Sequence, residues 1–316
     1  MLIEIGVFAG GLLLLVLGAD AFVRGAGGMA LRFGISPFVV GLTLVGFGTS
    51  VPEMAVNMTA VLDGRTDLAV GNIVGSNIAN VGLILGCAAL VAPLTVQMRM
   101  LRVEMPLLLL SCALLWLLAL NGWLGRFDGL LLLAGFVVLM GLIASQARSE
   151  PEAVQEELGH SATARGGVVI NGTRIVLGFA GLLGGAHLMV DSAVDLARLW
   201  GIGELVIGLT IVAIGTSLPE LAASLVAAWR GDVDIAVGNV VGSCLFNLLL
   251  ILGASAALRP LPIESSMLWV EIPLMTAFAL AIYPLARGDL TLGRRQGLVL
   301  LAAFAAFMGY ELQGLY

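Results

Sequence analysis

The chain has 316 residues, of which 59% are hydrophobic and only 11% are charged, and its formal net charge at pH 7 is −6. Soluble domains carry about 25% charged residues, so this composition excludes an ordinary water-soluble protein and predicts an all-α membrane protein. The acidic balance, without a basic stripe, excludes nucleic acid as the expected partner.

Ten apolar stretches are long enough to cross a bilayer as helices, which requires about 20 residues each. In chain order they cover residues 3–24, 36–61, 67–91, 101–121, 128–147, 171–197, 204–229, 234–258, 267–286 and 295–314. Glu4 stands where a cleavable signal would carry positive charge, so we expect the first stretch to be retained. Cys87, Cys112 and Cys244 lie inside such stretches at unrelated spacings, which favours packing over disulfides or a metal cluster.

The fifteen basic residues are all arginine, and eleven fall in the loops of one side of the membrane against four on the other. Because positive charge gathers on the cytoplasmic side, this split places the loop after the fifth stretch in the cytoplasm and both termini outside the cell membrane. Near the ends of stretches we expect Glu104 and Glu271 to be solvated. Asp20 and Arg24 predict an interfacial ion pair, and His187 and Asp191 occupy the corresponding places in the second half.

The sequence contains an internal duplication with an offset of 167 residues. Residues 41–83 align without a gap on residues 208–250, and 22 of the 43 pairs are identical. The chain therefore divides into a first five-helix repeat (1–147), a cytoplasmic linker (148–168) and a second five-helix repeat (169–316). An odd number of spans in each repeat makes the two enter the membrane from opposite sides, which is the inverted-repeat design of secondary transporters.

Within each repeat, two apolar stretches are interrupted by small and polar residues. Gly46–Glu53 (GFGTSVPE) and Gly71–Asn80 (GNIVGSNIAN) return as Ala213–Glu220 (AIGTSLPE) and Gly238–Asn247 (GNVVGSCLFN). Glycine loosens a helix and proline removes a backbone donor, so we expect helices 2, 3, 7 and 8 to be broken there. Irregular backbone at membrane depth persists only where it is buried in protein or lines a hydrated cavity.

Glu53 and Glu220 stand at aligned positions in mid-span, where a charged residue costs about 2.5 to 3.5 kcal/mol. No arginine lies in the four interrupted stretches, so a bound cation or a proton must compensate the carboxylates. The candidate ligands near the glutamates are all oxygen atoms, which Ca²⁺ and Na⁺ prefer. The side chains that supply these oxygens are those of Thr49, Ser50, Ser76, Asn80, Thr216, Ser217, Ser243 and Asn247. A structural role stays open for each hydroxyl, and protonated carboxyls stay open for the glutamates.

The paired motifs GTSVPE with GNIVGSNIAN and GTSLPE with GNVVGSCLFN resemble the two alpha repeats of the calcium/cation antiporter superfamily, and most of all those of prokaryotic sodium/calcium exchangers. The resemblance covers essentially the whole chain in the number and order of spans. It implies ten helices around a central site and the electrogenic exchange of several Na⁺ for one Ca²⁺ by alternating access. This is transport rather than enzyme catalysis, with no cofactor beyond the transported ions and no protein partner.

The resemblance also assigns individual residues. Glu53 and Glu220 match the two central carboxylates that contact both ions. Thr49, Ser50, Ser76, Thr216, Ser217 and Ser243 match ligands of flanking Na⁺ sites, Gly46 and Ala213 match positions that lend a backbone oxygen, and Asn80 matches directly. Asn247 departs from the aspartate of several microbial relatives and of the potassium-dependent branch, which argues against K⁺ co-transport. Cys244 replaces an asparagine of many relatives.

Three alternatives stay open at this point. H⁺-coupled Ca²⁺ exchange would use the same two glutamates, because they could carry protons in place of Na⁺. A cation channel could use the same oxygen-rich helices. An intramembrane hydrolase is disfavoured because no Ser/His, Ser/Lys or Asp/Asp pair lies at matching depth. For an exchanger, we expect spans one and six, with their glycine pairs Gly10–Gly11 and Gly184–Gly185, to slide against the other helices.

Overall fold

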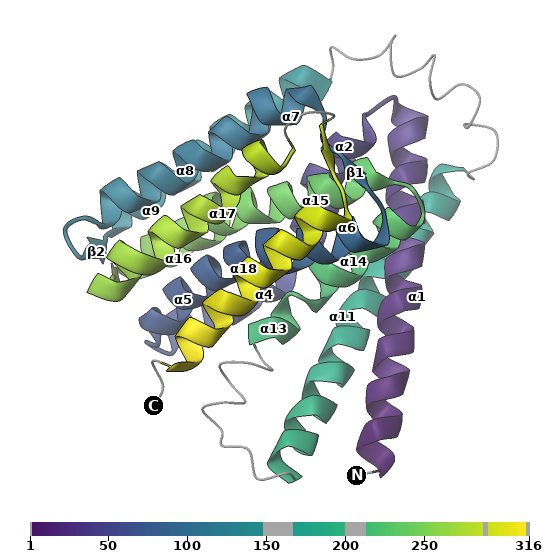
Figure 1. Cartoon of the computed structure of the whole chain (residues 1–316), viewed down its shortest axis with the longest axis horizontal. Helices are drawn as coiled ribbons and strands as arrows, with labels where there is room; N and C mark the ends of the chain where they lie inside the picture. Colours follow the sequence, from purple (N-terminus) through teal and green to yellow (C-terminus); the bar gives the residue numbers. More distant parts are fainter. Residues whose placement is uncertain (1, 148–166, 200–212, 287–289, 314–316) are drawn as a thin grey trace.

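The computed structural model describes residues 2–147, 167–199, 213–286 and 290–313, and the structural statements below concern these residues. Two long helices, α1 (Leu2–Phe33) and α11 (Val168–Leu199), lie side by side at one edge, and the remaining helices form the body next to them (Figure 1). Nearly all of the predicted linker, up to residue 166, falls outside the described residues.

The second predicted span is a helix in four segments. These are α2 (Pro37–Val40), η1 (Gly41–Val45), α3 (Gly46–Thr49) and α4 (Val51–Leu62). The first half continues through α5 (Thr66–Ala79), η2 (Asn80–Leu85), α6 (Gly86–Val91), α7 (Met98–Arg102), α8 (Glu104–Ala119) and α9 (Arg126–Ala147). The η segments are π-helices, in which each hydrogen bond spans one residue more than in an α-helix.

The described helices of the second half follow a similar order, with a π-helix in the place of α7. After α11 come α13 (Ala213–Thr216), α14 (Leu218–Trp229), α15 (Val233–Leu245), η5 (Phe246–Ile251), α16 (Leu252–Leu258), η6 (Met267–Glu271), α17 (Ile272–Leu285) and α18 (Arg294–Gln313). Helices that begin and end at aligned residues, such as α4 and α14, are what the duplication predicts.

Two short antiparallel strand pairs, which the sequence analysis did not predict, connect the halves at the ends of the helices. β1 (Leu94–Thr95) pairs with β4 (Thr291–Leu292), and β2 (Trp123–Leu124) pairs with β3 (Leu261–Pro262). Leu94 lies opposite Leu292, and Leu124 lies opposite Leu261. Each pair takes one strand from each half, so backbone hydrogen bonds tie the two halves together outside the helical core.

Seven described helices are long and apolar enough to cross a membrane, and an eighth is obtained if α2–α3 and α4, which bend by 42° at their break, count as one span. Two further predicted spans are represented by α14, the described part of stretch 204–229, and by α18, a 20-residue helix that opens on two arginines. The protein is therefore an all-helical, multi-pass membrane protein. The count of ten spans stays a prediction.

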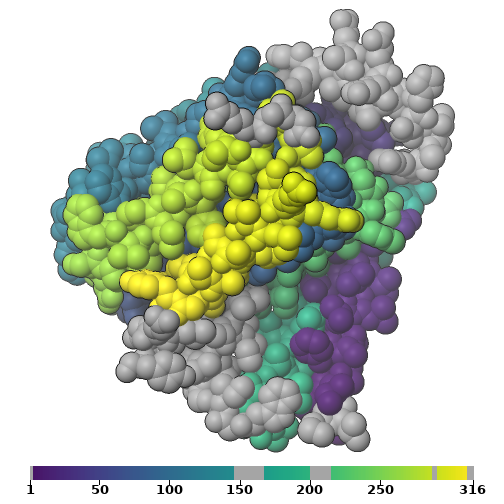
Figure 2. All heavy atoms as spheres, in the orientation of Figure 1, coloured from purple at the N-terminus to yellow at the C-terminus, as the bar shows by residue number. Residues whose placement is uncertain are grey.

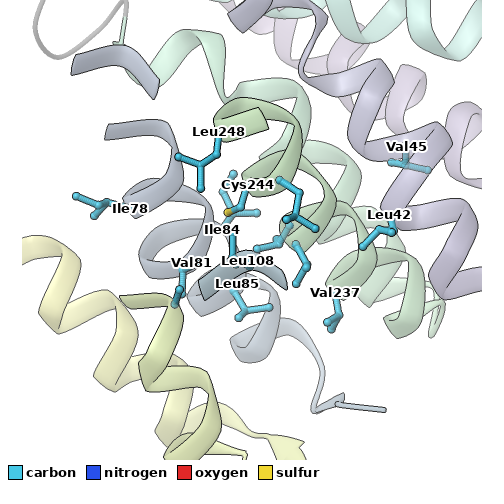
Figure 3. Close-up of a cluster of buried hydrophobic side chains, with 14 of the residues drawn as sticks. Leu42, Val45, Ile78, Val81, Ile84, Leu85, Leu108, Val237, Cys244 and Leu248 are labelled. Atoms are coloured by element: carbon cyan, nitrogen blue, oxygen red, sulfur yellow. The ribbon is translucent and has the colours of Figure 1, made fainter. Parts of the chain in front are cut away.

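Burial divides these helices into an inner and an outer set. In α15–η5–α16 and α5–η2–α6, 94% and 72% of the apolar stretch is buried, compared with 22–39% in the other continuous candidate spans. Leu42, Ile84 and Val237 belong to the apolar core between the inner helices (Figure 3). Outer helices such as α17 and α18 expose leucine side chains on the surface that would face lipid. Figure 2 shows this surface. The interrupted helices thus form the centre of the molecule.

The contact between α1 and α11 is built on glycine. A Cβ at Gly18 would lie 2.5 Å from the backbone nitrogen of Leu182, and one at Gly178 or Gly185 would also meet the backbone of α1. Of the predicted pair Gly10–Gly11, only Gly11 faces α11. Glycine thus lets the backbones of α1 and α11 pack directly against each other.

Glu104 corrects one expectation. It is not solvated: its side chain is buried in the first turn of α8, with Arg99 Nε 3.5 Å from Oε1. The positive end of the helix dipole and the arginine of α7 together compensate the carboxylate. The aligned residue, Glu271, is partly exposed, but its Oε2 is buried without a hydrogen-bond partner among the described residues, so it is not fully solvated either.

Candidate cation site

Two equivalent turns position the predicted carboxylates. Ser50 and Ser217 precede α4 and α14 with nearly equal backbone angles (φ −82°, ψ 4° and φ −91°, ψ 6°), and a proline follows two residues later in each helix. The next residues are Glu53 and Glu220, each in the first turn of a 12-residue helix. The unpaired backbone N–H groups of a first turn point toward the N-terminal end of the helix and make that end positive. Both carboxylates therefore lie at the positive end of a helix dipole.

The two halves hold each other's carboxylate. Ser50 Oγ donates a hydrogen bond to Glu220 Oε1 (3.3 Å), and Ser217 Oγ donates one to Glu53 Oε1 (3.2 Å). Both glutamates are only 1% exposed, and they are close enough to repel each other when ionised. Two carboxylates that are buried next to each other require a cation or a proton between them.

Four buried side-chain oxygens of the predicted site lack a hydrogen-bond donor among the described residues. They are Glu53 Oε2, Glu220 Oε2, Asn80 Oδ1 and Asn247 Oδ1. Leaving a buried acceptor unpaired costs about 1 to 3 kcal/mol, so these four oxygens need a donor or a cation. The described residues contain no cluster of three or more His, Cys, Asp and Glu side chains, so further ligands would have to be amide, hydroxyl and carbonyl oxygens. This donor set fits a hard cation.

The neighbouring hydroxyls meet at one backbone carbonyl. Thr49 Oγ1 lies 3.4 Å from Gly46 O, and Ser243 Oγ lies 3.5 Å from the same oxygen. Ser76 is buried on α5, against which α13 packs with Ala213 and Thr216 at its two ends. Each predicted ligand thus lies on one of the inner helices or their turns. Their role as ligands stays a prediction.

The interruptions take two forms, which the sequence did not distinguish. The predicted breaks are present at Ser50 and Ser217, but the prediction is wrong for the third and eighth helices, which continue through the π-helical turns η2 and η5. Asn80 opens η2 and Asn247 lies in η5. A π-turn adds one residue to the helix and redirects the side chains around it, which is why such turns recur at functional sites.

Sequence reasoning missed a set of hydrogen-bonded asparagines beside the site. Asn239 Nδ2 donates to Ser224 Oγ (2.9 Å) and to the backbone oxygen of Glu220 (3.3 Å), and its Oδ1 accepts from Thr49 (3.1 Å). The aligned Asn72 donates to Asn57 Oδ1 (2.8 Å). The identity of Asn72 and Asn239 in both copies of the GN motif was a signal that could have found them.

Asn77 is a second residue that the sequence analysis passed over. Its Oδ1 accepts a hydrogen bond from Asn247 Nδ2 (3.2 Å), and this bond fixes which end of the Asn247 amide lacks a partner. Cys244 stands at the aligned position and is buried, with Sγ 3.9 Å from Asn77 O, which agrees with its predicted packing role. Because Asn77 is not repeated in the second half, the duplication could not flag it.

A narrow apolar groove with no room for a water molecule lies beside the site. Its lining includes Ser50, Phe47 and Phe246, and the two phenylalanine rings lie 5.7 Å apart. Ser50 itself is only 3% exposed. The carboxylates are therefore closed off from the surface in this conformation.

Comparison with known proteins gives consistent matches over the whole chain. The sequence model of the family described as "Sodium/calcium exchanger protein" matches residues 3–144 and 173–313. The chain is 40% identical to the putative antiporter CaxA of Alkalimonas amylolytica and 33% identical to the sodium/calcium exchanger MaX1 of Methanosarcina acetivorans, covering 94–95% of this chain and 95% of each relative. A structure of the sodium-calcium exchanger NCX_Mj soaked with Na⁺ and Sr²⁺ superposes with a TM-score of 0.86 at 32% identity, over 98% of both chains.

Proposed function

The chain belongs to the sodium/calcium exchanger family, and from that premise we propose that it is a secondary antiporter that exchanges Na⁺ for Ca²⁺ across the cell membrane. Membership makes it a transporter rather than an enzyme. Na⁺ as the coupling ion, Ca²⁺ as the cargo and independence from K⁺ are the parts that the proposal adds.

One observation carries the proposal: four unpaired, buried oxygens from Glu53, Glu220, Asn80 and Asn247, two of them on carboxylates. Ca²⁺ takes about six to eight oxygens in flexible geometry, and the hydroxyls and the Gly46 carbonyl nearby can complete such a shell. When Na⁺ replaces Ca²⁺ on the same carboxylates, the two ions compete for one site. Competition makes exchange obligatory if the empty, doubly negative site is too costly to move through the membrane.

For the architecture we propose ten spans in two inverted halves of five, with both termini outside the cell. The aligned order of the helices and the reciprocal Ser50–Glu220 and Ser217–Glu53 hydrogen bonds support a twofold relation between the halves. The uneven arginine distribution supports the orientation. In this arrangement α1 and α11 would slide past the inner helices, exposing the site to one side at a time.

Reconstitution into liposomes tests the coupling ion. With Na⁺ inside, radiolabelled Ca²⁺ outside should enter, and K⁺ in place of Na⁺ should give no uptake. Uptake driven by a pH gradient without Na⁺ would instead identify an H⁺-coupled exchanger. Flux that needs no counter-ion and does not saturate would identify a channel.

Replacing Ser50 by alanine should raise the Ca²⁺ concentration for half-maximal uptake by roughly tenfold, because Glu220 loses a hydroxyl donor. Ser217→Ala should act equally on Glu53. The control is Ser111→Ala on α8, whose hydroxyl bonds backward to Leu107 O and should matter little. Unchanged Ca²⁺ dependence in the first two variants would contradict the reciprocal arrangement.

Asn247→Asp should move the voltage-dependent step of the cycle from the Na⁺-loaded site to the Ca²⁺-loaded site. In the wild type two carboxylates are neutralised by one Ca²⁺ and overcompensated by three Na⁺, so the Na⁺-loaded site would carry one positive charge. With a third carboxylate the Na⁺-loaded site is neutral and the Ca²⁺-loaded site carries one negative charge. Exchange of radiolabelled Ca²⁺ for unlabelled Ca²⁺ without Na⁺, measured under a K⁺ diffusion potential imposed with valinomycin, should depend on voltage only in the variant, and equal voltage dependence of both proteins would refute this charge balance.

A further inference from the structure

Asn239 occupies a position between the two halves of the proposed site. Its side chain lies on α15, is fully buried, and makes three hydrogen bonds: to Thr49 of the first half and to Ser224 and the Glu220 carbonyl of the second. Since the Glu220 carbonyl can only accept, the amide nitrogen must point toward α14 and the amide oxygen toward Thr49.

The Thr49 hydroxyl has one proton and several candidate acceptors, the Glu220 carboxylate among them. Asn239 Oδ1 lies 3.1 Å away, and Gly46 O, a predicted cation ligand, lies 3.4 Å away. A single O–H can make only one good hydrogen bond, so a bond to Asn239 keeps the Thr49 proton off the Gly46 carbonyl, which then has only the long contact from Ser243 Oγ (3.5 Å). The lone pairs of Thr49 then also stay free for a cation.

Resting on the proposed function, we infer that Asn239 is a positioning residue for cation binding. It draws the Thr49 proton away from the Gly46 carbonyl and holds the backbone of Glu220 in place. It contacts no ion itself. Its effect should fall on the ion that uses the Thr49 and Gly46 oxygens, which the flanking-site assignment makes Na⁺.

Asn239→Ala should therefore raise the Na⁺ concentration for half-maximal exchange about five- to tenfold, the worth of one buried hydrogen bond. The half-saturating Ca²⁺ concentration should change less. The matched control is Ser224→Ala, which removes another partner of the same amide and should shift the Na⁺ dependence less than twofold. In a Thr49→Val background, Asn239→Ala should shift the Na⁺ dependence much less than it does in the wild type, because only the bond to the Glu220 carbonyl is left to lose.

Equal shifts for Na⁺ and Ca²⁺, or additive effects of Thr49→Val and Asn239→Ala, would overturn the positioning role. A wild-type protein without Na⁺-driven Ca²⁺ uptake would refute the proposed function itself, which is a separate outcome.

A second, independent observation concerns an ion network that links α1 to the end of α14. Asp20 Oδ1 lies 2.7 Å from Arg230 Nη1, and Asp20 Oδ2 lies 2.8 Å from Arg24 Nε. Asp232 Oδ2 lies 3.9 Å from Arg230 Nε. Asp20 and Arg230 are about one-quarter exposed, so this network joins the sliding helix to the body of the protein.

The duplication reverses the sign of every member of this network. With the 167-residue offset, Asp20 aligns with His187 and Arg24 with Asp191, while Arg230 aligns with Asp63 and Asp232 with Arg65. Acid becomes base and base becomes acid at all four positions, histidine counting as the base. Complementary charge is therefore kept in the second set.

The charged residues of the two halves differ in whether they pair between helices. α1 packs along α14, whereas α11 has no comparable packing against α4 within the described ranges. His187 and Asp191 pair only along their own helix (3.2 Å) and are 76% and 58% exposed. The first network is thus engaged between helices, and the second lies open.

We propose that the two networks are alternating latches. When α1 and α11 move together, Asp20 leaves Arg230 and His187 reaches Asp63 at the end of α4, where a ring N–H donates to the carboxylate. Because histidine is shorter than arginine, α11 must then approach α4 more closely than α1 approaches α14. Opposite polarity also prevents mispairing, since Asp20 would repel Asp63.

Cysteine cross-linking tests the latches in the full-length protein with Cys87 replaced by alanine. A short bifunctional thiol reagent should join Asp63→Cys to His187→Cys in part of the population, and the link should stop exchange. In a separate variant, the same reagent should join Asp20→Cys to Arg230→Cys, which reports the other state. The control pair, Asp63→Cys with Asp195→Cys two turns further along α11, should not be joined.

Failure to join residues 63 and 187 under Na⁺, Ca²⁺ or ion-free conditions, while residues 20 and 230 are joined, would overturn the proposal. Charge reversal gives a second test that needs no cysteines. Arg230→Asp should slow exchange several-fold, and adding Asp20→Arg should restore it. No recovery in the double variant would equally count against a latch.

Discussion

Glu53→Gln and Glu220→Gln should each abolish Ca²⁺ uptake while leaving the protein folded and inserted. Each substitution keeps the size and a hydrogen-bond acceptor but removes one of the two buried charges. At about 4 Å and an effective dielectric constant of about 20, one unit charge contributes about 4 kcal/mol to another, and a divalent ion feels twice that. The loss in Ca²⁺ affinity is therefore roughly a thousandfold or more. Radiolabelled Ca²⁺ uptake into Na⁺-loaded liposomes measures it.

Glu104→Gln is the matched control for this experiment. Glu104 is also buried, also has an unpaired carboxylate oxygen and also stands in the first turn of a helix, but it lies on α8 outside the site. Exchange should persist in this variant. Retained exchange in Glu53→Gln or Glu220→Gln, or equal loss in all three, would remove the two glutamates from the cation site.

The pairing of the two carboxylates was predictable from the sequence because membrane depth makes charge expensive. Glu53 and Glu220 stand in mid-span at aligned positions without an arginine in reach, so compensation by an ion or proton followed from residue types alone. Which hydroxyl serves which carboxylate did not follow. The Ser50–Glu220 contact bridges 170 residues, and it depends on how the two halves meet rather than on local pattern.

Other parts of the fold could not be predicted because they also depend on how distant segments pack together. Glu104 was expected at the surface because it stands near a span end, but α7 folds over it and brings Arg99 close. The π-turns at Asn80 and Asn247 leave the helix continuous, so glycine content alone could not separate them from the true breaks at Ser50 and Ser217. Tertiary packing decides both cases, and a single sequence carries little information about it.

Gly242→Ala should disrupt the centre of the protein. Gly242 lies on α15, and an added Cβ would fall on the backbone carbonyl of Leu42 in η1, with the Leu42 Cα only 2.9 Å away. Backbone cannot rotate aside as a side chain can, so α15 and η1 must separate, and Ser243 would move away from Gly46 O, 3.5 Å distant in the native packing. Overpacking of this kind costs about 1 to 3 kcal/mol, and the midpoint of thermal unfolding in detergent should fall by roughly 5 °C.

The control is Gly141→Ala on α9, where an added Cβ meets no described atom within 4 Å. Alanine is the better helix former by about 1 kcal/mol, so this variant should be at least as stable as the wild type. Exchange should fall with stability in Gly242→Ala and stay normal in Gly141→Ala. If Gly242→Ala keeps both its unfolding temperature and its Ca²⁺ uptake, then α15 and η1 do not need backbone contact, and the separation between the two halves of the site is not set by glycine.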